Sequence, residues 1–363
     1  MRLSLLAFAA AILVVTGLPV LGEPAQGSDI ASQSTSPVIV AVLDTGIAAH
    51  PELGWRVRSD GTGRPGGVVL PGYDFVSDRW SAADGDGWDA DPTDPGDGVR
   101  VSEAADRPLC RSRVSSWHGT NVAGTIAGQG TVRPRARGLA PNARILPVRI
   151  LGRCGGNTAD AAAGILWSVG EPIPGVPDNP HPSRIVNLSL SGATDRCPRP
   201  LQTAIDIANE RGAVVVVAAG SAARNTREST PANCSGVFVV GSTDRFGKRS
   251  PTSNFGTEVT VSALGGNMAT GETDGIYTTT NKGRFRAGDA SYGYYQGTSA
   301  AVARVTGALA ALAKKYPAMT SQELIDAVME NLDPFTSGQC DAGAGLCGAG
   351  IVNVQRLLNN PAR

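Results

Sequence analysis

The chain has 363 residues, 41% of them hydrophobic, which is long for a single domain but suits a large α/β protein with a sizeable core. Its 32 lysine and arginine residues balance its 32 aspartate and glutamate residues, so the overall charge gives no reason to expect binding to nucleic acid or to an anionic membrane. Abundant glycine and proline, with only 5% aromatic residues, fit a loop-rich globular protein rather than a coiled coil or a disordered tail.

The first segment of the chain has the pattern of an export signal. Arg2 precedes an apolar run from Leu3 to Val15, and Val20-Leu21-Gly22 forms a plausible cleavage site. A membrane anchor is the alternative, but the run is shorter than the roughly 18 apolar residues of a spanning helix. We therefore expect residues 1–22 to be a signal peptide and the polar residues 23–36 to be a short linker or the remnant of a pro-segment.

From residue 37 onward, runs suited to buried strands alternate with segments of helical spacing. The strand-like runs lie at 37–46, 143–151, 184–190, 213–220, 236–243 and 258–263. The helix-like segments lie at 158–170, 201–212, 299–315 and 321–332. This alternation predicts an α/β fold with a mostly parallel central sheet flanked by helices. Residues 54–117 and 264–296 are expected to be long loops, which in a compact domain usually carry function.

Histidine is scarce, which narrows the search for a catalytic base. Of the three histidines, His50 and His181 each precede a proline and are expected to be surface turn residues. His118 instead begins a segment of small residues, "HGTNVAGTIAG", after a long loop. A histidine at that helix start would lie at the carboxyl edge of the sheet, where α/β proteins place their sites. A helix-capping histidine is the alternative interpretation.

Asp44 and Ser299 are the two partners that His118 could use. Asp44 ends the first strand in "VLDTG", at the same edge of the sheet, and Ser299 in "GTSAA" begins a helix, as an N-cap or as a nucleophile. An aspartic-protease mechanism needs two carboxylates, but no second Asp-Thr-Gly or Asp-Ser-Gly follows an apolar strand. The chain order Ser, Asp, His of the α/β-hydrolases is excluded because no histidine follows His181. The remaining order is Asp44, His118, Ser299, which is the subtilisin order.

The motifs around these residues resemble the subtilases, the subtilisin-like serine peptidases, and most of all the secreted bacterial members. The matching blocks, in chain order, are "VAVLDTGIAAHPEL", "HGTNVAGTIAG", "VRILGRCGG", "NLSLSG", "VVVVAAG", "PANCSGV" and "YQGTSAAVARVTG". The resemblance covers residues 37–357 and implies a subtilisin-like three-layer domain at 37–358. It also implies a secreted serine endopeptidase that acts on extended polypeptides.

The resemblance assigns a role to each matching residue. Ser299 would attack the scissile carbonyl, His118 would carry the proton, and Asp44 would orient the imidazole. The backbone N–H of Ser299 would be one oxyanion donor. Two segments would flank the primary specificity pocket, and the first would pair with substrate as an added strand. These substrate-binding residues are Ser189, Leu190, Ser191, Ala218, Ala219 and Gly220.

Two departures from the family pattern bear on the rate of catalysis. Family members place asparagine, the second oxyanion donor, where this chain has Ser221, and Asn225 could substitute only if the loop bends back. Residues 300–304 are Ala-Ala-Val-Ala-Arg, where the family usually has Met, two small residues, Pro and His. These departures leave open a second hypothesis, a subtilase-fold protein that binds peptides but hardly cleaves them.

A loop rich in aspartate is a candidate calcium site. Residues 84–97 read "DGDGWDADPTDPGD", and hard oxygen ligands in a loop suit calcium. The loop is not an EF-hand, because the glutamate at its twelfth position is missing. Subtilases commonly bind calcium, so we weigh a structural calcium site against a plain solvated acidic loop. The best candidate ligands are Asp84, Asp86, Asp89 and Asp91.

The six cysteines are expected to form disulfides, because export would place the chain in an oxidising compartment outside the cell or in a periplasm. None is in a paired CxxC arrangement, which argues against a zinc site. The resemblance to secreted subtilases implies the pairs Cys110–Cys154, Cys197–Cys234 and Cys340–Cys347. No self-association motif is visible, so we expect a monomer that contacts neither nucleic acid nor, once the signal is removed, a membrane.

Overall fold

A computed structural model of the protein describes residues 37–57, 63–105, 107, 110–133, 135–343 and 345–359. Its centre is a nine-stranded sheet with the strand order β14-β15-β11-β10-β8-β6-β1-β5-β4. All neighbouring strands of this sheet are parallel except β14 and β15, which are antiparallel. The predicted signal peptide (1–22) and linker (23–36) lie outside the described residues.

The bounds of the elements follow the predicted strands and helices closely. The strands are β1 (Ile39–Asp44), β2 (Arg56–Val57), β3 (Gly63–Arg64), β4 (Tyr73–Asp74), β5 (Arg144–Arg149), β6 (Ile185–Leu188), β7 (Gly192–Ala193), β8 (Val214–Ala218), β9 (Ser229–Thr230), β10 (Phe238–Thr243), β11 (Val261–Leu264), β12 (Ile276–Asn281), β13 (Ala290–Tyr295), β14 (Leu332–Asp333) and β15 (Ile351–Val352). The helices are α1 (Arg79–Ala82), α2 (Val101–Ala104), α3 (His118–Ala127), α4 (Thr158–Ser168), α5 (Arg199–Glu210), α6 (Thr298–Lys315), α7 (Ser321–Glu330) and α8 (Val354–Asn359), with two short 3-10 turns at Thr226–Glu228 and Glu272–Asp274.

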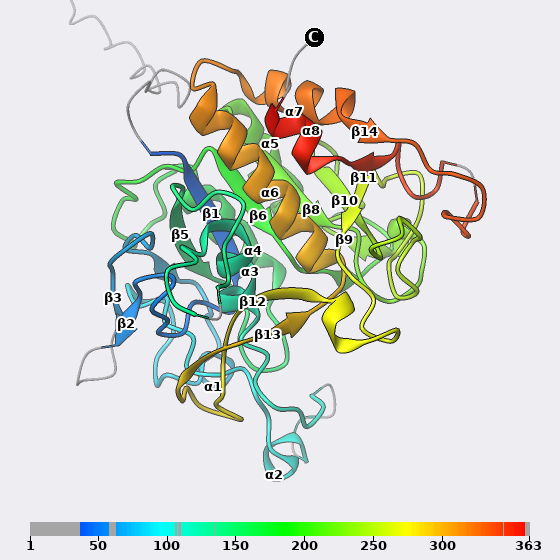
Figure 1. The fold of residues 1–363 in the computed structure, drawn as a ribbon. Coiled ribbons are helices and arrows are strands. Elements are labelled where there is room, and N and C mark those ends of the chain that lie inside the picture. Colours follow the sequence, from blue (N-terminus) through cyan, green and yellow to red (C-terminus); the bar gives the residue numbers. More distant parts are fainter. Residues whose placement is uncertain are drawn as a thin grey trace, which may run out of the picture.

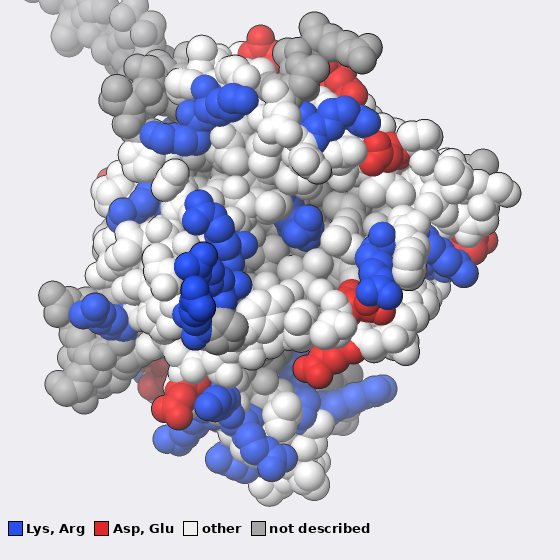
Figure 2. Space-filling model, viewed as in Figure 1, with Lys and Arg blue, Asp and Glu red and all other residues white. Residues whose placement is uncertain are grey.

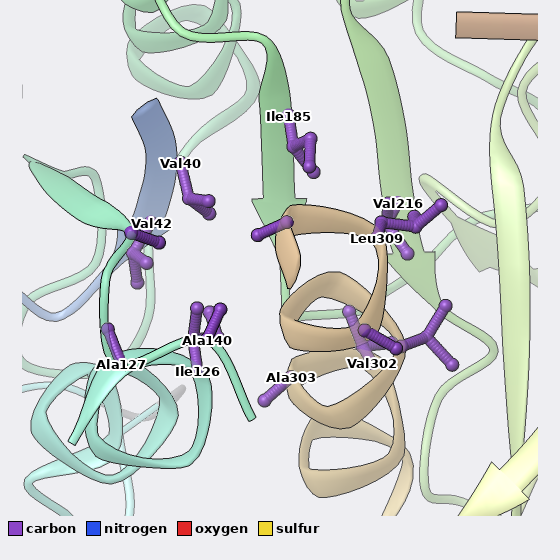
Figure 3. Packing of buried hydrophobic residues seen from close by; sticks show 14 of the residues in the cluster. Val40, Val42, Ile126, Ala127, Ala140, Ile185, Val216, Val302, Ala303 and Leu309 are labelled. Atoms are coloured by element: carbon purple, nitrogen blue, oxygen red, sulfur yellow. The ribbon is translucent and has the colours of Figure 1, made fainter. Parts of the chain in front are cut away.

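The sheet is buried on both faces, which explains its nearly continuous apolar strands. Successive residues of a strand point to opposite faces, so Val40 and Val42 of β1 join one core while Ala41 and Leu43 join the other. Helices α3 and α6 cover the first face, and α4 and α5 cover the second (Figure 1). Figure 3 shows the first core, in which the strand residues Val40, Val42, Ile185 and Val216 lie near Ile126, Ala127, Val302, Ala303 and Leu309 of the helices. The α/β three-layer prediction is therefore confirmed.

One predicted loop is wrong in part, because residues 264–296 contain a hairpin. Strands β12 and β13 pair antiparallel, with Thr278 opposite Gly293, and lie beside α3. The sequence alternates poorly here, because both Thr278 and Thr279 are buried against α3. Their hydroxyls donate to the carbonyls of Asn121 and Thr120, so α3 covers two neighbouring positions of the strand.

Three disulfides fasten the loops to this framework. They join Cys110 to Cys154, Cys197 to Cys234, and Cys340 to Cys347, which are the expected pairs. The first connects the 79–115 region to the loop after β5, and the third closes a separation of only 7 residues. Within the described part of the chain, no helix has both the length and the apolar character needed to cross a bilayer.

Candidate active site

The carboxyl edge of the sheet brings Asp44 and His118 together. Asp44 is the last residue of the central strand β1 and is fully buried, and the Thr45 N–H donates to its Oδ1 at 2.7 Å. His118 is the first residue of α3, following Trp117, which has a left-handed backbone conformation (φ 53°). The Nδ1 atom of His118 lies 2.8 Å from Oδ1 and 2.9 Å from Oδ2 of Asp44. The carboxylate therefore fixes the orientation of the imidazole ring.

The environment of His118 favours its protonated form. Burial by itself lowers the pKa of His118, but the charge and hydrogen bonds of Asp44 raise it, and so do the charges of Asp97 and Asp94. The net result is a pKa above the ordinary value of 6.5. The ring remains accessible, because 25% of its side chain is exposed. This combination is suited to a group that takes up and releases a proton.

Ser299 lies at the N-terminus of α6, the long helix that crosses the sheet. Its hydroxyl donates to the backbone carbonyl of Ser189 at 2.7 Å, and the Ser189 hydroxyl donates back to the Ser299 carbonyl at 3.2 Å. No hydrogen bond joins Ser299 to His118 in the described structure. The third predicted residue is therefore placed beside the site but is not yet paired with the imidazole.

Ser221 does not stand alone at the predicted oxyanion position. Its hydroxyl accepts from the backbone N–H of Thr298 at 3.2 Å and lies 3.0 Å from the Thr298 hydroxyl. The Ser221 oxygen therefore accepts from the Thr298 N–H, and either of the two hydroxyls can donate to the other. Asn225 does not bend back to replace it, since its side chain accepts from the Arg227 N–H at the start of a 3-10 turn. Sequence reasoning missed the contribution of Thr298.

The first predicted pocket segment, 189–191, follows β6, and the second, 218–220, begins at the last residue of β8. Residues 189–191 continue from β6, and the residues after them, Gly192 and Ala193, form β7 and pair with β9. Ala218 and Ala219 are buried, and Gly220 has a left-handed φ of 101°. A Cβ atom at Gly220 would lie 2.3 Å from the amide nitrogen of Asn254, so only glycine fits this turn. Asn254 was not predicted, but its side chain bonds the Ala219 carbonyl and the N–H of Ala222.

A cavity of about 500 Å³ opens next to His118. Residues 188–192 line it, together with residues from the loop after β5 and the start of α4, between Ile150 and Thr158. Ala161 and Leu201 add apolar surface. The cavity is therefore a groove lined by these two backbone segments and by His118.

The start of the serine helix is tightly enclosed. Ala300, Ala301, Val302 and Ala303 are all fully buried, so the small residues sit within a packed core. Arg304 is the one charged residue in this stretch of α6. Burial lowers its pKa, and its buried Nε has no hydrogen-bond partner among the described residues. The Nε atom of Arg304 is therefore a buried donor without a partner among the described residues.

The loop that is predicted to bind calcium carries four candidate carboxylates, which are Asp84, Asp86, Asp89 and Asp91. Among the residues that the structure describes, no group of three or more His, Cys, Asp or Glu side chains is placed to hold a metal ion. Asp91 accepts from the hydroxyl of Thr93, and burial raises the pKa of Asp89 to about 6. The predicted calcium ligand set therefore stays a prediction.

A buried arginine supplies the positive charge that the acidic loop needs. Arg149, the last residue of β5, is 1% exposed and pairs with Asp74 and Asp84, while also donating to the Ala82 carbonyl. Burial lowers the pKa of Arg149, but the charges of Asp74, Asp94 and Asp84 outweigh this effect and raise it. The apolar pattern at 143–151 predicts only a strand for this residue and not its pairing with the acidic loop.

His50 is also placed differently from its prediction. It is 1% exposed, with Nε2 2.9 Å from the carbonyl of Ser291 and Nδ1 accepting from the Glu52 N–H. Burial lowers its pKa from the ordinary value of 6.5. His50 therefore connects the first turn to strand β13 instead of lying in a surface turn.

With the geometry established, comparison with known proteins identifies the family. Residues 35–350 match the subtilase family, and the chain therefore belongs to it. An extracellular protease of Xanthomonas campestris is 39% identical over 323 residues, which are 89% of this chain and 51% of that protein. An extracellular basic protease of Dichelobacter nodosus is 36% identical over 328 residues, which are 89% of this chain and 50% of that protein. The chain thus spans about half the length of these two relatives.

Solved structures support the same fold. A structure of proteases from Pseudoalteromonas arctica has a TM-score of 0.79 and 36% identity, covering 93% of this chain and 94% of that chain. A cold-adapted subtilisin-like serine proteinase has a TM-score of 0.58 at 24% identity, covering 89% of this chain and 97% of that chain. The second likeness shows the fold alone. The fold is therefore subtilisin-like.

Proposed function

We propose that the protein is a secreted serine endopeptidase that cleaves peptide bonds through Asp44, His118 and Ser299. The observation that carries the proposal is the pair of contacts between His118 Nδ1 and both oxygens of Asp44, at 2.8 and 2.9 Å. These contacts leave Nε2 as the ring nitrogen that can accept a proton. Ser299, at the N-terminus of an 18-residue helix, supplies the hydroxyl.

The reaction divides into acylation and deacylation. The Ser299 hydroxyl turns from the Ser189 carbonyl toward His118, gives its proton to Nε2, and its oxygen bonds to the scissile carbonyl carbon. The C–N bond then breaks as His118 gives the proton to the leaving amine. In deacylation, a water molecule gives a proton to His118 Nε2, and its oxygen bonds to the acyl carbon. The bond from that carbon to the Ser299 oxygen then breaks as His118 returns the proton to Ser299. Asp44 stays ionised throughout and stabilises the imidazolium.

The negative charge of each tetrahedral intermediate needs donors on its oxygen. We assign one donor to the backbone N–H of Ser299, where the helix N-terminus also favours negative charge. The Ser221 hydroxyl, held by Thr298, takes the place of the usual asparagine side chain. A hydroxyl is shorter than a carboxamide, so we expect a weaker second donor and a slower enzyme.

The groove beside His118 fits an extended polypeptide. Residues 189–191 form one wall, and an extended substrate would pair with their backbone as an added strand. Ala218, Ala219 and Gly220 would border the pocket for the residue before the scissile bond. The extracellular relatives and the N-terminal pattern support export after cleavage near Gly22, with the mature chain acting as a monomer.

Labelling with a fluorophosphonate probe tests the nucleophile directly. We expect the wild-type protein to be labelled and to cleave casein or a peptide, and Ser299→Ala to lose both properties while keeping its melting temperature. Folded wild-type protein that takes up no label would refute the serine mechanism.

The second candidate is a subtilase-fold protein that binds peptides with little cleavage. The observation that favours it is the Ser299 hydroxyl, which is bonded to the Ser189 carbonyl instead of His118. Under this hypothesis a peptide would bind to the wild-type protein without turnover or labelling. The same labelling experiment therefore separates the two candidates.

A further inference from the structure

Three segments meet beside His118, which lines the groove. Residue Val99 pairs with Arg113 as an antiparallel bridge, and the Ser115 N–H donates to the Arg284 carbonyl at 2.7 Å. The Trp117 ring donates to the Gly283 carbonyl at 2.8 Å, so the turn between β12 and β13 rests directly against the residue before His118. Any charge on these segments therefore acts on the entrance to the proposed active site.

The exposed charges on these segments are mainly positive. We call them the cationic rim, and its members are Arg100, Arg111, Arg113, Lys282, Arg284 and Arg286. Figure 2 shows lysine and arginine side chains gathered on the lower part of this face, where α2 and the turn of the β12–β13 hairpin lie in Figure 1. This local excess is not expected from a chain whose lysine and arginine balance its acidic residues.

Few carboxylates among the described residues neutralise the rim. Arg113 lines the groove with His118 and pairs with Asp97 at 2.9 Å, yet 47% of its side chain is exposed, against 3% for Asp97. The carboxylate of Asp97 is also occupied by the N–H and hydroxyl of Ser116. Both residues line the groove, but the guanidinium is by far the more exposed of the two charges.

The remaining members are paired weakly or not at all. Arg100 lies 3.6 Å from Glu103 and packs over the ring of Phe285. The side chains of the other four have no hydrogen bond, ion pair or ring contact with the described residues; they are Arg111, Lys282, Arg284 and Arg286. Asp289, in the same turn, is exposed and offsets only part of this charge.

We propose that the cationic rim selects polypeptide substrates with aspartate or glutamate close to the scissile bond. Exposed guanidinium groups beside a groove with apolar walls attract carboxylates and raise their rate of encounter. Planar guanidinium groups also suit carboxylates in a bidentate geometry. The inference rests on the proposed function in one respect, since it assumes that polypeptide occupies the groove.

Binding to an inactive variant tests this selection independently of catalysis. Ser299→Ala would be titrated with fluorescent peptides that differ only in Glu against Gln, or Asp against Asn, at each position flanking the cleavage site. We expect about 10-fold tighter binding of the acidic peptides at low salt, and loss of most of this preference near 1 M salt, where the screening length is about 3 Å. Dissociation constants equal within twofold for all matched pairs would overturn the inference.

A charge-matched pair of variants locates the effect. We expect Arg284→Gln/Arg286→Gln to reduce the preference by about threefold or more while leaving the binding of neutral peptides unchanged. The control, Lys314→Gln/Lys315→Gln, removes two charges at the far end of α6, about 25 Å from its start, and should leave the preference intact. An equal loss in both variants would show a general effect of net charge and would contradict a local rim.

Arg113→Lys keeps the charge on the groove wall but loses the planar guanidinium group, so it should keep part of the preference.

A single-stranded oligonucleotide of equal charge serves as a competitor. If it displaces the acidic peptide more strongly than an unlabelled copy of that peptide does, the rim recognises nucleic acid and the inference fails. Turnover of neutral peptides by the wild-type protein, without any acidic preference, would leave the proposed function standing and reject only the rim.

Discussion

At the residue scale, the site depends on how a few buried groups balance charge and hydrogen bonds. Asp44 has no solvent contact, and its two oxygens converge on His118 Nδ1. This arrangement sets both the tautomer and the proton affinity of the imidazole. Ser221 and Arg304, by contrast, stand in the two places where the motifs predict a departure from the family pattern, and substitutions at both can be measured.

The pH dependence of kcat/KM should report the pKa of His118. Because Asp44 raises that pKa, the acid limb of wild-type activity is expected above pH 6.5, and activity should fall as pH drops through it. In Asp44→Asn the raising charge is lost while burial remains, so the limb should move to lower pH and kcat should fall by about 10⁴. An acid limb that stays in place in this variant would mean that another group is being titrated.

Ser221→Asn should raise kcat by about 10- to 10³-fold, because the longer carboxamide can reach the oxyanion. Steady-state kinetics on a neutral peptide would measure this change, with Ser221→Ala as the reference that removes the hydroxyl donor. An unchanged kcat in Ser221→Asn would indicate that the Ser221 and Thr298 hydroxyls already provide full stabilisation.

Arg304→Met should stabilise the fold by about 1–3 kcal/mol, because it removes a buried donor that has no partner and replaces the stem of the arginine as far as Nε with an apolar chain. Urea denaturation would measure the free energy of unfolding. Lys314→Met, on the exposed end of the same helix, is the control and should change stability by less than about 0.5 kcal/mol. Destabilisation by Arg304→Met would show that the guanidinium has a partner after all.

At the element scale, the walls of the groove are short loops held at the ends of parallel strands. Residues 188–192 and 150–158 leave adjacent regions of the sheet, and the Cys110–Cys154 disulfide anchors the second of them. Since these loops have few regular backbone hydrogen bonds of their own, covalent links and side-chain caps keep the groove in shape.

Removing disulfides should destabilise the protein according to the length of chain that each closes. Replacing Cys110 and Cys154 by alanine removes a link across 44 residues and should cost about 4 kcal/mol, whereas replacing Cys340 and Cys347, 7 residues apart, should cost about 2 kcal/mol. Denaturant titrations of the two double variants would give the difference. The Cys110/Cys154 variant should also show a higher KM, because Cys154 lines the groove.

The sequence predicts the elements better than it predicts the contacts between them. Apolar runs identify β1, β5, β6 and β8 because strands buried on both faces leave an unambiguous pattern. The β12–β13 hairpin is not predicted, because buried and exposed residues do not alternate in a threonine-rich strand that packs against α3. The pairing of Arg149 with Asp84 was equally invisible, because the two residues are 65 positions apart. Asp44, His118 and Ser299 were found by chain order, yet the present hydrogen bond of Ser299 could come only from coordinates.

At the scale of the whole molecule, positive and negative charges are equal in number but unevenly distributed over the surface. The formal net charge is zero at pH 7, and removal of residues 1–22 would take away one arginine, Arg2. The mature protein would then be close to neutral in solution, with its unpaired cations gathered near the groove.

Near-neutral molecules repel one another weakly, so we expect the protein to be least soluble close to pH 7 and more soluble at pH 9. Static light scattering across this range would check the prediction, with the Lys314→Gln/Lys315→Gln variant shifting the minimum to lower pH. Equal scattering at all pH values would show that association is governed by apolar contacts instead.

The position of β1 in the middle of the sheet also has a consequence for the order in which the protein folds. Its first residues pair with Arg144 on one side and with Ile185 on the other, so the strand that carries Asp44 has no local partner. Asp44 and His118 are 74 residues apart, and the contact between Ser189 and Ser299 spans 110. Such distant pairings make folding slow, because the entropy of closing long loops is lost before any stabilising contact forms. The residues proposed to act in catalysis therefore lie on segments that are far apart in the chain, and we expect a partly folded chain to lack a complete active site.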